Sequence, residues 1–145
     1  MTTKEIKEYF RQIRREQFEI NHLTEMIKNE ELSLLPSAIR YDKEKVQTSP
    51  EDVLSKRVAK ITELETEYAS SLATLKLNKV RAEAMLRSLD NSDEREVMRW
   101  YYMSFNDRHP FTWDEVAVKM SYTKRWILKL HGNAIMHLSE SKSSS

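Results

Sequence analysis

The stretch that decides the fold is TWDEVAVKMSYTKRWILKL, residues 112–130. Thr112 and Glu115 have the spacing of a capping box, which predicts a short helix from Thr112 to about Met120. Ser121-Tyr122 follows as a turn, and Thr123 can cap a second helix. The inner face of that second helix is Ile127, Leu130, Ala134 and Leu138. Two short capped helices around a tight turn are the layout of a helix-turn-helix.

The second of these helices concentrates positive charge, because no acidic residue occurs from Tyr122 through Ser139. In a helix-turn-helix, the early exposed residues of the second helix enter the major groove of DNA. The candidate DNA-binding residues are Thr123, Lys124, Arg125, Trp126, Leu128 and Lys129. Arg125 suits a bidentate contact to guanine, and Leu128 suits a thymine methyl group. The two lysines and the Thr123 hydroxyl suit phosphates, whereas Trp126 fits either packing or a DNA contact.

Two long heptad-patterned segments precede this motif. In the first, about Lys4 to Leu35, isoleucine or leucine recurs every seven residues at Ile6, Ile13, Ile20, Ile27 and Leu34. The second begins at Ser49-Pro50 and continues to Leu89, with the repeat Leu54, Ile61, Tyr68, Leu75, Ala82 and Leu89. Gln17, Glu65 and Lys79 interrupt the companion positions. Such repeats predict coiled-coil-like seams that pack antiparallel within one chain, pair with a second chain, or do both.

We therefore predict an all-α protein in which residues 1–89 form a long helical hairpin with a loop at about 36–49. Pro36 ends the first helix, since the residue before a proline avoids the α region. Residues 90–138 would form the helix-turn-helix domain, opened by a helix over about Ser92 to Ser104. The Ser-rich residues 139–145 would be a disordered tail.

The composition of the 145 residues supports this class and excludes several others. One Gly and three Pro leave a multi-stranded fold almost no turn residues. The absence of Cys removes thiolate metal sites and thiol nucleophiles, and His131 and His137 lack metal-ligand spacing. No phosphate-binding glycine loop or other catalytic motif occurs, so we expect neither an enzyme nor a cofactor. No apolar run could span a bilayer, and no signal peptide precedes the first helix, so we expect a cytoplasmic protein.

Residues 97–138 resemble the sigma-factor region-4-like helix-turn-helix of phage late-gene transcriptional regulators of the RinA/ArpU type. The resemblance rests on Phe111 to Ala117, Met120 to Thr123, Arg125 to Ile127, Leu130 to Ala134, and Leu138. Ser121 stands at a turn position that is often Gly, and Trp126 replaces a smaller polar residue. The resemblance implies binding to double-stranded promoter DNA in a bacterial host cell, and a contact with RNA polymerase.

The resulting hypothesis is a sequence-specific transcription regulator that acts as a homodimer, with two second helices reading successive major grooves. Two alternatives stay open. One is a small terminase-type packaging subunit, which would form a ring on packaging DNA. The other is a coiled-coil adaptor that docks RNA polymerase without touching DNA.

Overall fold

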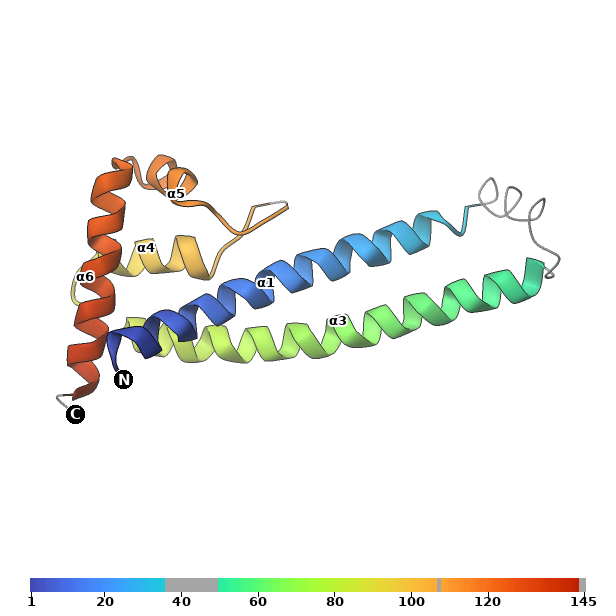
Figure 1. Ribbon diagram of the computed structural model, residues 1–145, viewed down its shortest axis with the longest axis horizontal. Coiled ribbons are helices and arrows are strands. Elements are labelled where there is room, and N and C mark those ends of the chain that lie inside the picture. The colour runs from blue at the N-terminus through green and yellow to red at the C-terminus, as the bar shows by residue number, and fades with distance from the viewer. Residues whose placement is uncertain (36–49, 107, 144–145) are drawn as a thin grey trace. The chain divides into compact units, whose positions relative to one another are not determined.

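The computed structural model describes residues 1–35, 50–106 and 108–143, which form five helices and no strand. They are α1 (Thr3–Leu32), α3 (Pro50–Leu86), α4 (Ser92–Tyr102), α5 (Trp113–Met120) and α6 (Lys124–Ser143) (Figure 1). The predicted all-α class, with a long helical hairpin before smaller helices, is confirmed. The predicted loop at 36–49 lies outside the described residues. None of the described helices combines the length and apolarity needed to cross a bilayer.

The chain divides into two compact units, and the division differs from the boundary near residue 89 that the sequence predicted. Unit 1 comprises Met1–Phe18 and Thr74–Ser145, and unit 2 comprises Glu19–Ala73. The first turns of α1 and the last turns of α3 therefore belong with the C-terminal helices. The physical reason is that α4 buries Met98 and Tyr102 as well as Val97, so it needs apolar partners outside the helix-turn-helix.

Unit 2 contains the second half of α1 and most of α3. Ile20, Leu23, Ile61 and Leu64 are its buried apolar residues, so the heptad seam closes within a single chain. Ile27 and Tyr68 are half-buried. Leu54 and Val58 near the start of α3 are exposed although both belong to the predicted seam. The seam thus weakens toward the start of α3.

In unit 1 the same two helices continue their seam, and its polar interruptions meet each other. Gln17 is 3% exposed, and its Oε1 accepts a hydrogen bond of 3.0 Å from Lys79 Nζ. Asn78 donates to both carboxylate oxygens of Glu16 at 3.0 Å. Burial lowers the pKa of Lys79. The two residues that break the heptads in sequence thus satisfy one another across the helix pair.

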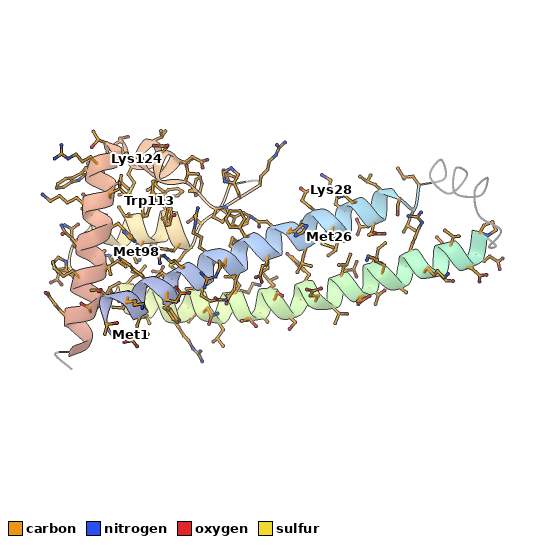
Figure 2. The ribbon with its side chains drawn as sticks, viewed as in Figure 1. Met1, Met26, Lys28, Met98, Trp113 and Lys124 are labelled. Carbon is orange, nitrogen blue, oxygen red and sulfur yellow. The ribbon has the colours of Figure 1, made fainter. Side chains whose placement is uncertain are left out.

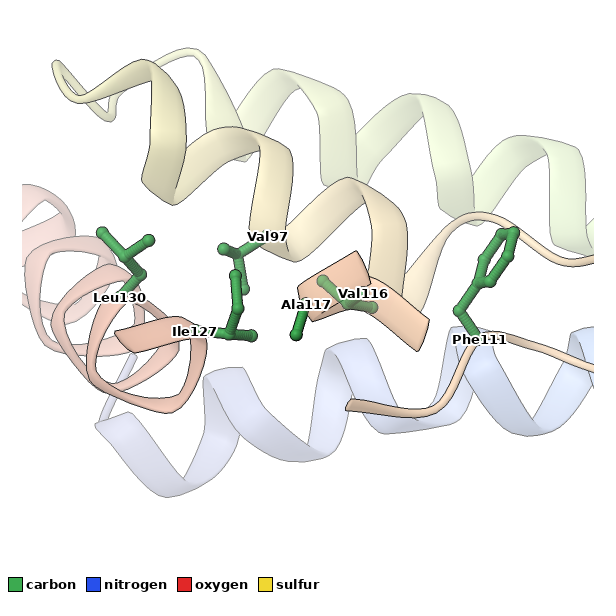
Figure 3. Packing of buried hydrophobic residues seen from close by; sticks show 6 residues of the cluster. All are labelled: Val97, Phe111, Val116, Ala117, Ile127 and Leu130. Atoms are coloured by element: carbon green, nitrogen blue, oxygen red, sulfur yellow. The ribbon is translucent and has the colours of Figure 1, made fainter. Parts of the chain in front are cut away.

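The helix-turn-helix has its own small core, formed by Val97, Phe111, Val116, Ala117, Ile127 and Leu130 (Figure 3). Val116 and Ile127 are fully buried, and Ala117 is small enough to let α6 cross closely over α5. Trp100 packs edge-on against Phe111 with ring centroids 5.3 Å apart. Of the aromatic residues around α4, Tyr102 is buried while Phe105 remains 49% exposed.

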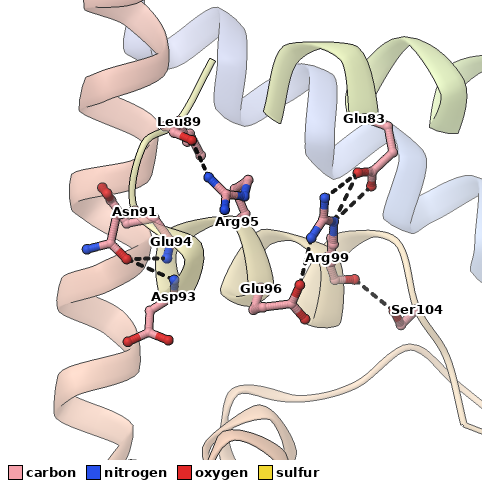
Figure 4. Close-up of polar contacts among 9 residues, drawn as sticks. All are labelled: Glu83, Leu89, Asn91, Asp93, Glu94, Arg95, Glu96, Arg99 and Ser104. Atoms are coloured by element: carbon pink, nitrogen blue, oxygen red, sulfur yellow. Dashed lines mark hydrogen bonds and ion pairs between the residues drawn. The ribbon is translucent and has the colours of Figure 1, made fainter. Parts of the chain in front are cut away.

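Polar contacts fix α4 in place (Figure 4). The Asn91 side chain caps α4 by accepting from the amides of Asp93 and Glu94 at 2.8 and 3.2 Å. Arg99 bridges α4 to α3 through Glu83, with a closest contact of 2.7 Å, and also pairs with Glu96. These carboxylates raise the pKa of Arg99. At the other side of α4, the buried Glu94 accepts from His137 of α6 at 2.6 Å.

Helix α6 is longer than the sequence predicted. The residues from Ser139, expected to be a disordered tail, continue the helix through Ser143, and only 144–145 lie outside the described part. No proline or glycine interrupts residues 133–143, and the Ser139 hydroxyl donates to the Met136 carbonyl within the helix at 2.7 Å. The buried Leu138 anchors this last part of the helix.

One arginine of α1 joins the first helix to the helix-turn-helix. Arg14 Nη1 donates to the carbonyl of Tyr101 and to that of Phe111, each at 2.8 Å. Its guanidinium also lies over the Tyr101 ring, 4.0 Å from the centroid. The Tyr101 carbonyl lies at the end of α4, and the Phe111 carbonyl lies just before α5. Carbonyls at such positions lack the hydrogen-bond partners that a helix interior provides. Arg14 therefore fixes the α4–α5 connection onto α1.

We expect Arg14→Ala to lower the free energy of unfolding by about 2–4 kcal/mol, because two carbonyls lose a charged donor. Arg15→Ala is the matched control. Arg15 is an exposed neighbour whose ion pair with Glu8, at 2.6 Å, contributes about 0–1 kcal/mol. Urea unfolding of both variants measures the difference. Equal losses in the two variants would show that Arg14 has no special role in stability.

We also expect a fragment that starts at Leu89 to unfold without a cooperative transition, since it lacks the parts of α1 and α3 that belong to unit 1. A chain that joins Met1–Phe18 to Thr74–Ser145 through about six Gly/Ser residues should unfold cooperatively. Such a linker reaches ~20 Å, whereas packed helix axes lie only about 8–10 Å apart. Thermal circular dichroism compares the two. A cooperative transition in the short fragment would show that the domain boundary lies near residue 89, as the sequence predicted.

Candidate nucleic-acid interface

The turn between α5 and α6 is built by local hydrogen bonds. The predicted capping box is present: Thr112 Oγ1 accepts from the Glu115 amide at 3.2 Å, and Glu115 Oε1 accepts from the Thr112 amide at 3.0 Å. That backbone hydrogen bond is the main cause of a lowered Glu115 pKa. Ser121 ends α5 with φ of 58°. This left-handed conformation, at a turn position that is often Gly in such motifs, costs a non-glycine residue roughly 1–2 kcal/mol.

The six predicted DNA-binding residues all lie on one exposed stretch, from Thr123 to Lys129. Thr123 precedes α6 and caps it, since its Oγ1 accepts from the Trp126 amide at 3.2 Å. Trp126 is 41% exposed and Leu128 is 42% exposed. Lys124, Arg125 and Lys129 are also exposed, whereas Ile127 and Leu130 face the core. We name Thr123, Lys124, Arg125, Trp126, Leu128 and Lys129 the α6 face.

Trp126 is a surface residue rather than a member of the core. Its ring lies 6.5 Å from that of Tyr122, and Lys129 Nζ lies 5.5 Å above it. Tyr122 in turn donates to Asp93 of α4 at 2.8 Å. These contacts hold the indole at the exposed side of the first turn of α6. Trp126 is therefore positioned for contact with a partner.

The charged side chains of the α6 face differ in their surroundings. Lys124, at the start of α6 (Figure 2), lies 3.5 Å from Asp114 of α5, so an acid is its neighbour. Both members of that pair are more than half exposed, and water weakens it. Lys129 contacts an aromatic ring instead of an acid. The face combines a positive helix start, an arginine, two lysines and apolar side chains, which can contact phosphates and base edges.

Sequence reasoning missed a second positive surface next to the α6 face. In unit 1 a cleft of about 380 Å³ is lined on the α1 side by Lys7, Arg11, Arg14 and Arg15. Its other side includes Trp113, Leu128 and His131. A signal did exist in the sequence: basic residues at positions 7, 11 and 14 recur every three or four residues. The near-cancellation of charge along α1 concealed this basic side of the helix.

His131 adjoins this cleft as a largely buried imidazole. Its Nε2 lies 2.6 Å from the Tyr102 hydroxyl, and its ring packs edge-on against Trp113 at 4.8 Å. Burial, followed by the positive charges of Lys7 and Arg11, lowers the pKa of His131 to about 4. Burial also raises the pKa of Tyr102. The pair is therefore neutral near pH 7, and a single hydrogen bond joins the hydroxyl and the imidazole.

The two histidines of α6 do not belong to a metal-binding cluster among the described residues. Among the described residues, no three His, Asp, Glu or Cys side chains gather in a way that could hold a metal ion. His131 and His137 contact different partners, Tyr102 and Glu94. Both histidines are explained by packing and hydrogen bonding within unit 1.

In comparisons with known proteins, no family model, curated protein or solved structure matches this chain.

The shifted pKa of His131 predicts a pH dependence of stability. Because the folded-state pKa, about 4, lies below the ordinary 6.5, the unfolded chain takes up this proton first. Stability is therefore full above pH ~6.5 and falls as the pH drops toward 4, by at most about 1.4 kcal/mol per pH unit from this group. Urea unfolding between these values should show a slope that His131→Asn reduces. An unchanged slope, or an NMR titration of the ring near 6.5 in the folded protein, would contradict this.

Proposed function

We propose that this protein is a sequence-specific transcription regulator that binds double-stranded promoter DNA by inserting the start of α6 into the major groove. The observation that carries the proposal is the α6 face. Its three basic side chains and two apolar ones are exposed on the second helix of a helix-turn-helix whose inner face is fully packed. Apolar side chains, Ile127 and Leu130, form the inner side of this part of α6, so its exposed basic side chains are available for recognition.

The roles of the individual residues follow from their positions. Arg125 is the base-reading residue, since a guanidinium can donate two hydrogen bonds to O6 and N7 of guanine. Lys129 contacts a phosphate, and Trp126 beneath it adds an apolar contact to the DNA. Leu128 contacts a thymine methyl group. The Thr123 hydroxyl caps α6 by accepting from the Trp126 amide, and the earlier first-turn amides of Lys124 and Arg125 suit a phosphate.

Within this proposal the protein acts as a homodimer in the cytoplasm of a bacterial host, and it contacts RNA polymerase. The exposed seam residues near the start of α3, Leu54 and Val58, offer apolar surface for a second chain. Two copies would bring two α6 helices to half-sites about 34 Å apart on one side of the DNA. The polymerase contact rests on the resemblance to sigma region 4 alone.

Substitutions on the α6 face test the proposal. On the preferred site, selected from genomic fragments, Arg125→Ala should cost roughly 1–3 kcal/mol and blur the sequence preference. Lys129→Ala should weaken binding to all sequences alike and reduce the salt slope by about one. Lys60→Ala, an exposed lysine of α3 in unit 2, is the charge-matched control and should leave binding unchanged. Fluorescence anisotropy at several salt concentrations measures all three.

Neither substitution on the α6 face should change thermal stability, since both side chains are exposed. If Lys124, Arg125 and Lys129 can all be replaced by Ala without any change in affinity, α6 does not read DNA. The adaptor that docks RNA polymerase without touching DNA would then be the better hypothesis.

A further inference from the structure

The cleft between the first half of α1 and the helix-turn-helix is a second positively charged feature of unit 1. Its volume is about 380 Å³, and Lys7, Arg11, Arg14 and Arg15 line the side formed by α1. None of the described residues that line it is acidic. On the same helix, Glu8 pairs with Arg15 at 2.6 Å, and the charge of Arg11 contributes less than Arg15 to the lowered pKa of Glu8. Lys7, Arg11 and Arg14 therefore give the cleft a positive field that an anion would neutralise.

The surroundings strengthen this field. Lys7, Arg11 and His131 line the same cleft, and the two positive charges contribute, after burial, to the lowered pKa of His131. Both cations therefore lie close to a partly buried, neutral imidazole. Charges beside low-dielectric walls are screened less than those on an open helix surface. Arg14 is already committed to the carbonyls of Tyr101 and Phe111, so it supplies positive charge while holding the wall. Lys7 and Arg11 are the cations placed to contact a ligand.

The aromatic side chains of the cleft argue against a stacked base as its ligand. Tyr101 lies between the Arg14 guanidinium at 4.0 Å and the Trp113 ring, which stacks on it at 3.6 Å. His131 packs edge-on against Trp113. Both faces of Tyr101 are thus occupied. The exposed ring of Phe18 also lines the cleft, with the Arg14 guanidinium 5.8 Å from its centroid, so N–H donors and positive charge surround the rings of this cleft. Phosphate oxygens are the acceptors that suit such donors.

The position of Leu128 indicates which molecule would supply a phosphate to this cleft. It lines the cleft and also belongs to the α6 face, so the two positive surfaces are continuous. We propose that the cleft binds a backbone phosphodiester of the same DNA duplex whose major groove α6 reads, with Lys7 and Arg11 as the contacting residues. This inference rests on the proposed function, and it assigns α1 a direct part in DNA binding.

The test compares two double variants that remove equal charge. The cleft variant, Lys7→Gln with Arg11→Gln, removes the two cations that are proposed to contact the phosphate. Lys76→Gln with Arg87→Gln removes one lysine and one arginine from exposed positions of unit 1 outside the cleft. In anisotropy titrations, the cleft variant should lose about 10- to 50-fold in affinity near 0.1 M salt and one to two units of salt slope. The loss should be the same for the preferred site and a scrambled duplex, because phosphates carry no sequence information.

The three tryptophans report on separate places, so indole N–H signals in NMR spectra locate the contact. Trp126 lies on the α6 face, Trp113 lines the cleft, and Trp100 packs on the helix-turn-helix core. Duplex DNA should shift the signals of both Trp126 and Trp113 in the wild type. In the cleft variant it should shift Trp126 and leave Trp113 nearly unmoved.

Three results would overturn the inference in distinguishable ways. If DNA shifts Trp126 alone and the cleft variant keeps the wild-type salt slope, the proposed function stands and the cleft takes no part in it. If both double variants lose affinity equally, only total charge matters. If the full-length chain binds no duplex, the proposed function fails as well. A Trp113 shift with a nucleoside triphosphate in that case would assign the cleft to a free phosphate ligand.

Discussion

The contact of Arg14 with the carbonyls of Tyr101 and Phe111 holds the rest of unit 1 in register. These two carbonyls flank the α4–α5 connection, so a single guanidinium fixes both ends of that connection to α1. The same group stacks on Tyr101, which in turn stacks on Trp113 at the first position of α5. The orientation of α5, and of α6 packed on it, therefore depends on a residue almost a hundred positions earlier in the chain.

This dependence explains why the helix-turn-helix is not a self-contained module here. Its own cluster of six buried side chains is small, and two of the largest buried residues of α4, Met98 and Tyr102, point outside it. Phe10 of α1 packs against Tyr102 with ring centroids 5.5 Å apart. The long helices thus supply part of the apolar surface that the C-terminal helices need. A coiled-coil-like hairpin and a helix-turn-helix share one core.

The same sharing brings two sets of positive charge together. The α6 face contributes Lys124, Arg125 and Lys129, and α1 contributes Lys7 and Arg11 across the cleft. The chain as a whole has a net charge of only +1, so polyanion binding is not expected from composition. Local arrangement changes that expectation, because Leu128 joins the two surfaces. A duplex that follows both would be held by groove contacts on one side and by backbone contacts on the other.

Much of this architecture was determined by the sequence itself. Scarcity of glycine and proline fixed the all-helical class, heptads fixed the long helices, and Thr112 with Glu115 fixed the start of α5. These are local effects of capping, backbone freedom and periodicity, so they can be inferred from a few neighbouring residues. The exposure of Thr123 to Lys129 follows from the same periodicity, since the apolar row of α6 occupies its opposite side.

Tertiary structure decided what no local pattern contains. Gln17 and Lys79 appear in the sequence as separate defects of two seams, and only the packed hairpin makes them a hydrogen-bonded pair. Such a pair favours one register, because any shift would leave buried polar groups without partners. Likewise, the division of the chain into two units departs from the predicted boundary near residue 89, and the contact of Tyr102 with Phe10 of α1 is one long-range reason for it. The basic cleft arises for the same reason: Lys7 and Arg11 meet Leu128 and His131 only through long-range packing.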